Sequence, residues 1–140
     1  MIVVLDTASV SALAPFNERN RARLRALRQR ASDFVLPAAV LAEGVLTGNP
    51  GRDFHVQRFL ELVSVAAVDE QLGLVAGALR QAEIRSGIDP PPSAVDAIVV
   101  AVADRIAAHT DVEIITGDGG DIESLASLGQ HADRIAVKLV

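Results

Sequence analysis

Short runs of apolar residues alternate along the chain with longer segments in which apolar side chains recur every three or four positions. The short runs are rich in Val, Ile and Leu, which is typical of strands that are buried on both faces. The longer segments gather their apolar side chains on one side, as amphipathic helices do. This alternation predicts an α/β domain with a central, mostly parallel sheet and helices on both faces.

The pattern sets approximate bounds for the strands and helices. The predicted strands are Ile2–Leu5, Phe34–Leu36, Val63–Val68, Val112–Ile115 and Ile135–Val140. The predicted helices are Ser9–Ala14, Glu18–Ala31, Ala38–Leu46, Asp53–Leu62, Glu70–Arg85, Ala94–Ala108 and Asp121–Leu128. Asp69 and Ser93 stand where helix caps are expected. Because no repeat, low-complexity tract or linker divides the chain, residues 1–140 are expected to form a single domain.

The composition excludes several classes of protein. Without Cys, the chain has no disulfide scaffold, no Cys-ligated zinc and no Cys nucleophile, which fits a reducing compartment. A hydrophobic content of 50% is too high for a disordered chain. No apolar run reaches the roughly 18 residues of a membrane span. The N-terminus has no basic leader or cleavage signal, so we expect a cytoplasmic protein that does not interact with a membrane.

The net charge of −5 conceals an uneven distribution. Half of the 12 arginines fall in one short, acid-free segment: Arg19, Arg21, Arg23, Arg25, Arg28 and Arg30. That segment carries +6, which leaves −11 for the rest of the chain. A solvated helix with an Arg-rich outer face is the simpler interpretation. A concentrated basic stretch can also bind a polyanion locally, even in an acidic protein.

Acidic side chains stand at or near the ends of the predicted strands. In an open parallel sheet, the functional crevice lies beyond the carboxyl ends of the strands. Asp6 directly follows the first strand, and Asp118 follows the fourth strand by a few residues. Asp96 lies in the first turn of the helix predicted after the Pro-rich loop. Glu43 lies midway along the helix predicted after the second strand.

Each of these acids also has a structural explanation. Asp6 is as well placed to cap the next helix as to bind a ligand. Asp96 fits a variant capping box and the favourable end of the helix dipole. Glu43 suits an exposed position on a helix. Asp118 suits a turn, and Asp121 suits a helix N-cap.

Taken together, the acids indicate a metal site. Carboxylates crowded into one crevice repel one another, and a divalent cation relieves that repulsion. Mg²⁺ prefers hard oxygen ligands, and a bound ion of this kind can activate water and neutralise charge on a phosphodiester. The three His residues suit surface or helix-end positions better than ligand positions. An all-oxygen donor set favours Mg²⁺ or Mn²⁺ over zinc.

Four segments, in order and spanning nearly the whole chain, carry a family resemblance: Val3–Ser9, Leu36–Glu43, Ser93–Ala103 and Ile114–Ile122. With these segments the chain resembles the PIN-domain ribonucleases, in particular the VapC-type toxins of bacterial toxin–antitoxin modules. The resemblance implies a compact three-layer α/β/α PIN-like fold and metal-dependent endonucleolytic cleavage of RNA. It also implies a homodimer and a cognate VapB-like antitoxin that binds across the active-site groove.

The resemblance also assigns roles to the matching acids. It implies a catalytic quartet formed by Asp6, Glu43, Asp96 and Asp118. Within the quartet, Asp6, Asp96 and Asp118 would hold a metal ion or its water. Glu43 would complete the acidic pocket, orienting water or a second metal.

Two further residues have secondary roles by the same resemblance. The hydroxyl of Thr116 would orient a carboxylate or a phosphate, and Asp121 has a counterpart in many relatives. The turn at residues 117–120 is richer in Gly than is usual in the family, which leaves the position of Asp118 open. The Arg-dense stretch is not a family motif.

We therefore expect a Mg²⁺- or Mn²⁺-dependent ribonuclease that hydrolyses RNA with metal-activated water. The arginines expected to contact the RNA backbone or the antitoxin are Arg19, Arg21, Arg23, Arg25 and Arg28. The first alternative is a PIN-like domain that binds RNA or a partner without cutting. The second is a receiver-type signalling domain, which needs an acidic pair after the first strand and a late Lys. Here the only Lys is Lys138, in the terminal strand, and no such pair is present. A phosphatase with an Asp-x-Asp nucleophile is favoured still less, because residue 8 is Ala.

Overall fold

The computed structural model describes residues 1–140 and contains every predicted strand and helix. The strands are β1 (Ile2–Leu5), β2 (Asp33–Pro37), β3 (Ser64–Ala66), β4 (Val112–Thr116) and β5 (Ile135–Leu139). The helices are α1 (Thr7–Leu13), α2 (Glu18–Arg30), α3 (Ala38–Leu41), α4 (Pro50–Leu60), α5 (Glu70–Arg85), α6 (Ala94–Ala107) and α7 (Gly119–Ser127). A 3₁₀ turn, η1 (Ala132–Arg134), precedes β5. No helix is both long and apolar enough to cross a membrane.

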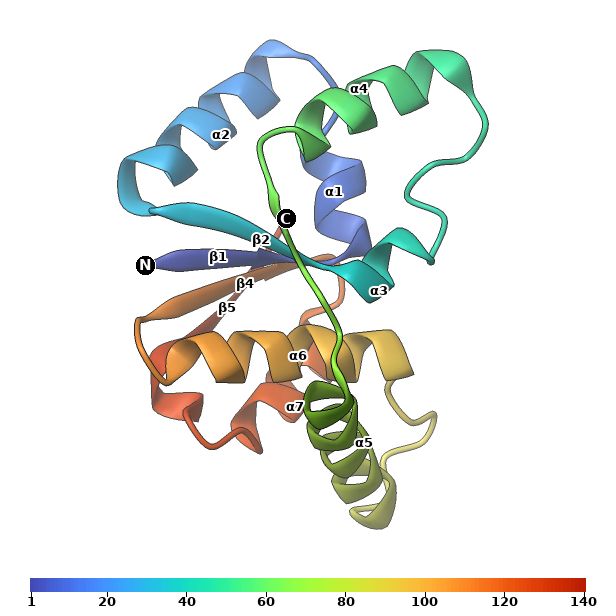
Figure 1. The fold of residues 1–140 in the computed structure, drawn as a ribbon, viewed down its shortest axis with the longest axis vertical. Helices are drawn as coiled ribbons and strands as arrows, with labels where there is room; N and C mark the ends of the chain where they lie inside the picture. The colour runs from blue at the N-terminus through green and yellow to red at the C-terminus, as the bar shows by residue number, and fades with distance from the viewer.

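The five strands form one parallel sheet in the order β3-β2-β1-β4-β5. Helices α1, α2 and α4 cover one face, and α6 and α7 cover the other, with α5 packed outside against them (Figure 1). This arrangement confirms the predicted three-layer α/β/α architecture. The chain builds outward from β1 in both directions, so the topological switch point lies between β1 and β4. In such sheets that switch point is where a crevice opens for ligands.

Helix α6 is the most deeply buried helix, and it carries Asp96 in its first turn. Its small side chains, such as Val99 and Val100, are fully buried and let the helix pack against four of the five strands. The Ser93 side chain caps its N-terminus, as predicted, by accepting from the Asp96 backbone N–H. The apolar sequence of α6 therefore reflects its place inside the core, and its N-terminus fixes Asp96 at the open end of the sheet.

The segment after β2 differs from the prediction. The helix expected to run to Leu46 ends at Leu41, because the chain turns and Gly44 adopts a φ of +80°, a conformation that favours glycine. Glu43 therefore lies in this turn and not midway along a helix. Helix α4 begins at Pro50 and not at the predicted Asp53, because Asn49 accepts hydrogen bonds from two backbone N–H groups and Pro50 suits the first helical position.

The N-cap of α5 gives the fold a dependence on acid pH. Arg105 donates two hydrogen bonds to the Asp69 carboxylate, at 2.9 and 2.8 Å, and together with the Leu72 N–H these lower the pKa of Asp69 to about 2. A lowered carboxyl pKa stabilises the fold above the unfolded-state value, and that contribution is lost as the pH falls from about 4 to about 2. Asp69→Asn keeps a capping side chain but removes this titration. We expect the variant to lose less stability than the wild type over that range in urea unfolding followed by circular dichroism. An equal loss in both proteins would contradict the assignment.

Candidate active site

Asp6 lies at the carboxyl end of β1 and is only 7% exposed. It caps α1: one oxygen, Oδ1, accepts from the Ser9 N–H at 2.6 Å, and the Asp6 N–H donates to Ser9 Oγ at 2.8 Å. The other oxygen, Oδ2, has a single long hydrogen bond of 3.4 Å from the Gly117 N–H. The capping interpretation of Asp6 is therefore correct. It does not exclude a ligand role, because a carboxylate has a second oxygen to offer.

The turn that follows β4 contacts Asp6 through Gly117, the residue before Asp118. Thr116 is fully buried, and its hydroxyl accepts from the Asp118 N–H at 2.9 Å and donates to the Asp118 carbonyl at 3.2 Å. This hydroxyl orients the backbone of Asp118, whereas the sequence suggested a carboxylate or a phosphate as its partner. Asp118 takes the N-cap position of α7, but its exposed side chain makes no capping hydrogen bond. The carboxylate is thus free to bind a ligand.

The contact between α1 and this turn depends on a missing side chain at Gly117. A Cβ at Gly117 would lie 2.5 Å from the Cβ of Ala8, which is too close for two carbon atoms. We expect Gly117→Ala to lower the free energy of unfolding by about 1–3 kcal/mol, as overpacking does. Adding Ala8→Gly should restore most of that loss, apart from up to about 1 kcal/mol for a glycine in a helix. Urea unfolding of both variants tests this, and a single variant as stable as the wild type would show that the contact is not tight.

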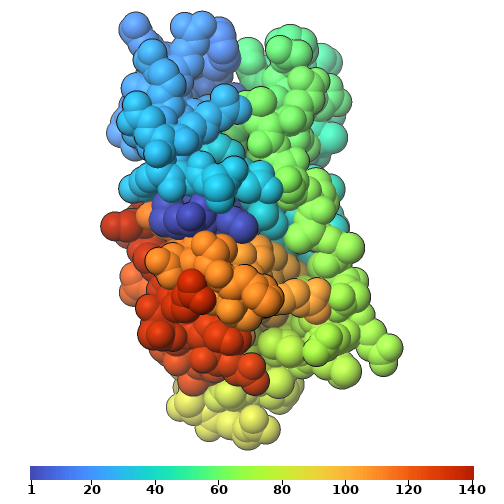
Figure 2. Space-filling view, turned by 60° about the vertical axis from the view of Figure 1, so that its left-hand side comes forward, coloured from blue at the N-terminus to red at the C-terminus, as the bar shows by residue number.

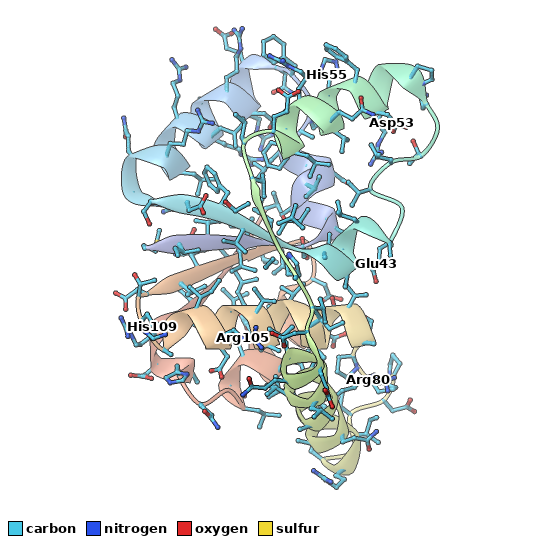
Figure 3. The ribbon with its side chains drawn as sticks, viewed as in Figure 1. Glu43, Asp53, His55, Arg80, Arg105 and His109 are labelled. Atoms are coloured by element: carbon cyan, nitrogen blue, oxygen red, sulfur yellow. The ribbon has the colours of Figure 1, made fainter.

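Asp96 is held at the start of α6 by Ser93. Ser93 Oγ accepts from the Asp96 N–H at 3.0 Å and donates to Asp96 Oδ2 at 2.7 Å. The loop before Ser93 is anchored by Arg80, whose Nε donates to the Pro92 carbonyl at 2.9 Å (Figure 3). These contacts fix the Asp96 side chain and leave its Oδ1 without a protein partner.

Glu43 reaches the same end of the sheet from the turn after α3. Figure 3 shows it directly after that helix, on the side of the molecule where α6 begins. Its Oε2 accepts from Thr7 Oγ1 at 2.9 Å, and Thr7 is the residue next to Asp6. Although its helical placement was wrong, Glu43 still lies at the carboxyl end of the sheet, in contact with the first residue of the helix that Asp6 caps. It is exposed, and its Oε1 makes no hydrogen bond.

Asp121 links the acids of α6 and α7 electrostatically. It lies in the first turn of α7 and not at the predicted N-cap, because the helix begins at Gly119. Burial raises the pKa of the Asp121 carboxyl, and the nearby charges of Asp118, Asp96 and Glu83 raise it further. Carboxylates of α5, α6, α7 and the β4 turn therefore lie near one another, while Asp6 contacts the same turn through the Gly117 N–H and Glu43 contacts Thr7 beside Asp6. We call Asp6, Glu43, Asp96, Asp118 and Asp121 the acidic site.

The donor chemistry of the acidic site fits a hard divalent cation, because every available ligand atom is an oxygen. No imidazole takes part: His109, for example, lies beyond the far end of α6 (Figure 3). As the side chains stand, no three His, Asp or Glu groups in the structure are arranged to hold a metal ion jointly. The fit therefore rests on the oxygen donors that lack partners and on the mutual repulsion evident at Asp121.

The arginines of α2 offer a basic surface. Four of those expected to contact RNA or an antitoxin are exposed (Arg19, Arg21, Arg25 and Arg28), and Arg23 is half-buried. None of these five forms an ion pair, whereas Arg30 pairs with the buried Glu113. The guanidinium of Arg21 lies 4.2 Å over the Phe16 ring. A solvated face and a polyanion-binding face both remain compatible with this arrangement.

An apolar groove between α2 and α4 was not predicted from the sequence. It has a volume of about 460 Å³, and Figure 2 shows the two helices side by side, α2 in blue and α4 in green. Three of the four Phe residues of the chain line it, and two of them, Phe16 and Phe54, remain 67% and 59% exposed. The sequence did offer one signal for this groove, because the chain has only four aromatic residues and two of them stand in polar surroundings in the sequence. A surface of this kind marks a binding site more often than a solvated face.

Comparisons with known proteins report on the fold. No protein-family model and no curated protein matches the sequence. A chain of the VapBC2 structure from Rickettsia felis, bound to a DNA fragment from its promoter, superposes with a TM-score of 0.72 at 14% identity. The match covers 100% of this chain and 99% of that chain. A chain of DNA-bound VapBC from Salmonella typhimurium gives a TM-score of 0.69 at 16% identity, covering 99% and 98%. The protein therefore has the fold that its sequence predicts, a PIN-like three-layer α/β/α domain shared with these chains of VapBC complexes.

Proposed function

We propose that the protein is a divalent-metal-dependent endoribonuclease of the cytoplasm and the toxin of a toxin–antitoxin pair. The observation that carries the proposal is the convergence of carboxylates from β1, the β4 turn, α6 and α7 at the switch point of the sheet. The shared fold supports it, because the similar structures are VapBC complexes. The RNA-cleaving activity, the metal and the partner are all parts of the proposal.

The residues proposed to hold Mg²⁺ or Mn²⁺ are Asp6, Asp96 and Asp118. A bound cation would neutralise charge on the phosphodiester and activate a water molecule. Asp6 offers Oδ2 and Asp96 offers Oδ1, while their other oxygens are fixed by helix caps. Because those caps are already formed, the free oxygens point from rigid elements and need little ordering.

The remaining acids have supporting roles in the proposal. Glu43 Oε1 makes no hydrogen bond, so it is the atom available to orient water or to accept its proton. Thr116 fixes the backbone from which the Asp118 side chain extends. Asp121 adds negative charge beside Asp118, which strengthens the attraction for a cation. Covalent catalysis is not part of the proposal, because the hydroxyls at the acidic site have no His base beside them and contact carboxylates instead.

A VapB-like antitoxin is the proposed protein partner. The apolar groove between α2 and α4 has the shape and chemistry to take the apolar face of a helix. Arg21 of α2 lines this groove and forms no ion pair, so a partner with an acidic or amphipathic tail would be complementary in charge. The similar structures are themselves VapBC complexes, which supports the existence of a partner for this chain.

A homodimer is the proposed assembly of the protein alone. Leu74 on α5 is 69% exposed, and its neighbour Val75 is 41% exposed. Adjacent exposed apolar side chains on one helix mark a surface for association. Sedimentation should therefore give a species of about twice the 14.7 kDa chain mass.

A PIN-like domain that binds RNA without cutting it remains the second candidate, because no three ligands stand ready around a metal position. The two candidates separate when the purified protein is incubated with cellular RNA in Mg²⁺ or Mn²⁺ and in excess chelator. The nuclease proposal expects cleavage only with the cation. Cleavage that persists in chelator would exclude the metal mechanism, and metal-independent binding without any cleavage would favour the second candidate.

A further inference from the structure

Glu83 is a buried acid in the helical layer behind the acidic site. It lies on α5 and is only 2% exposed, in helical register with the buried Leu72, Ala76 and Leu79. Its Oε1 accepts from Ser124 Oγ at 2.6 Å, which joins α5 to α7. Its Oε2 is buried and has no hydrogen-bond partner. No cationic side chain forms an ion pair with it.

This carboxylate contacts α7, the helix that carries Asp121. Ser124 lies three residues after Asp121 on α7, so the two side chains share one face of that helix. Burial raises the pKa of Asp121, and the charges of Asp118, Asp96 and Glu83 raise it further. None of these three acids forms a hydrogen bond with Asp121. The unpartnered Oε2 therefore belongs to the same concentration of negative charge as the proposed metal ligands.

A purely structural role does not explain this arrangement. A buried charged oxygen without a partner destabilises a fold, and one beside other carboxylates does so further. A Gln would accept the same hydrogen bond from Ser124 without the charge, and an apolar side chain would fit the surrounding core. A cation bound near the acids of α6 and α7 would compensate this charge.

We propose that Glu83 is a positioning residue of the metal site, which holds α7 in place through Ser124 and raises the cation affinity of the acidic site through its buried charge. This inference rests on the proposed function. Residues behind a metal site commonly contribute in this way, and their loss costs about 10–100-fold in metal affinity. The proposed site thus includes a residue of α5, which lies outside the four segments that resemble the family.

The test compares wild type with Glu83→Gln, a substitution that keeps the shape of the side chain and its acceptor for Ser124. Glu123→Gln is the matched control, because Glu123 is an exposed glutamate on α7, the helix that Glu83 contacts through Ser124. Mn²⁺ affinity is measured by calorimetry, and thermal midpoints with and without Mn²⁺ are followed by circular dichroism, since the chain has no Trp or Tyr. Glu83→Gln should bind Mn²⁺ about tenfold more weakly. Without metal it should melt at a higher temperature than wild type, and the control should match wild type in both measurements.

The outcomes separate this inference from the proposed function. If wild type binds no Mn²⁺, the proposed metal site fails and this inference fails with it. If wild type binds Mn²⁺ and Glu83→Gln binds it equally well, the inference is overturned while the proposed function stands. A metal-free Glu83→Gln that melts below wild type would show that the carboxylate serves the fold, which also overturns the inference.

Discussion

Replacing Asp6 or Asp96 by Asn is expected to lower the rate of RNA cleavage by about a hundredfold or more while leaving the fold intact. Each substitution removes the charge of a proposed cation ligand, and such charges stabilise the transition state by several kcal/mol. The fold should survive because Asn caps a helix about as well as Asp. In Asp6→Asn the side-chain oxygen can still accept from the Ser9 N–H, and in Asp96→Asn it can still accept from Ser93 Oγ. Initial rates on a labelled RNA in Mg²⁺, with circular dichroism of each variant, measure both effects.

The matched control for these variants is Asp133→Asn. Asp133 is an exposed acid in the 3₁₀ turn before β5, at the opposite end of the sheet from the acidic site. Its replacement removes the same charge from the chain and should leave the cleavage rate unchanged. If Asp6→Asn and Asp96→Asn both retain full activity, the acidic site is not the catalytic site. If expression of the wild type arrests growth and either substitution relieves it, the toxin assignment is supported.

Reversing three charges on α2 has the second-largest expected effect. Arg21→Glu, Arg23→Glu and Arg25→Glu together should weaken binding to RNA or to the antitoxin by at least about tenfold at moderate salt. These arginines form no ion pair within the chain, so their charge is available to phosphates or to an acidic partner. Phosphate contacts position a nucleic acid without reading its sequence, so the loss should be similar for unrelated RNAs.

The salt dependence of affinity identifies the kind of contact that is lost. Fewer phosphate contacts release fewer counterions, so the variant should show a shallower fall of RNA affinity with salt. A control with Arg85→Glu and Arg134→Glu also adds negative charge but lies on α5 and η1, away from the basic helix. It should bind nearly as well as wild type. Unchanged affinity of the α2 variant for both RNA and the antitoxin would leave the arginines with a solvated role only.

Local signals were strong enough to predict much of the fold from the sequence. The bounds of α5 are as predicted, because Asp69 caps it and its apolar residues keep a helical period. The start of α7 was missed because Gly119 and Gly120 favour a turn. In the structure they are helical, since the hydroxyl of Thr116 orders the preceding turn and the buried Ile122 anchors the helix.

The candidate site was predictable only in part. Acids that follow parallel strands are expected at the same edge of the sheet, and Asp6 and the β4 turn are in contact at that edge. The neighbours of Asp121 depend on how α5, α6 and α7 pack, which no local pattern specifies. Glu83 did leave a signal, because it continues the apolar face of α5 that runs through Leu72, Ala76 and Leu79. A charged residue in such a position indicates either a buried partner or a site.

The most direct test of the central claim is a crystal structure of the protein soaked in Mn²⁺, with the metal located by its anomalous scattering. The proposed function predicts a strong peak among the carboxylates of Asp6, Asp96 and Asp118. Small rotations of the exposed Asp118 side chain are expected, because it has no capping hydrogen bond to break. An absence of any peak there at saturating Mn²⁺, or a peak only elsewhere on the molecule, would contradict the claim that these acids form a metal centre.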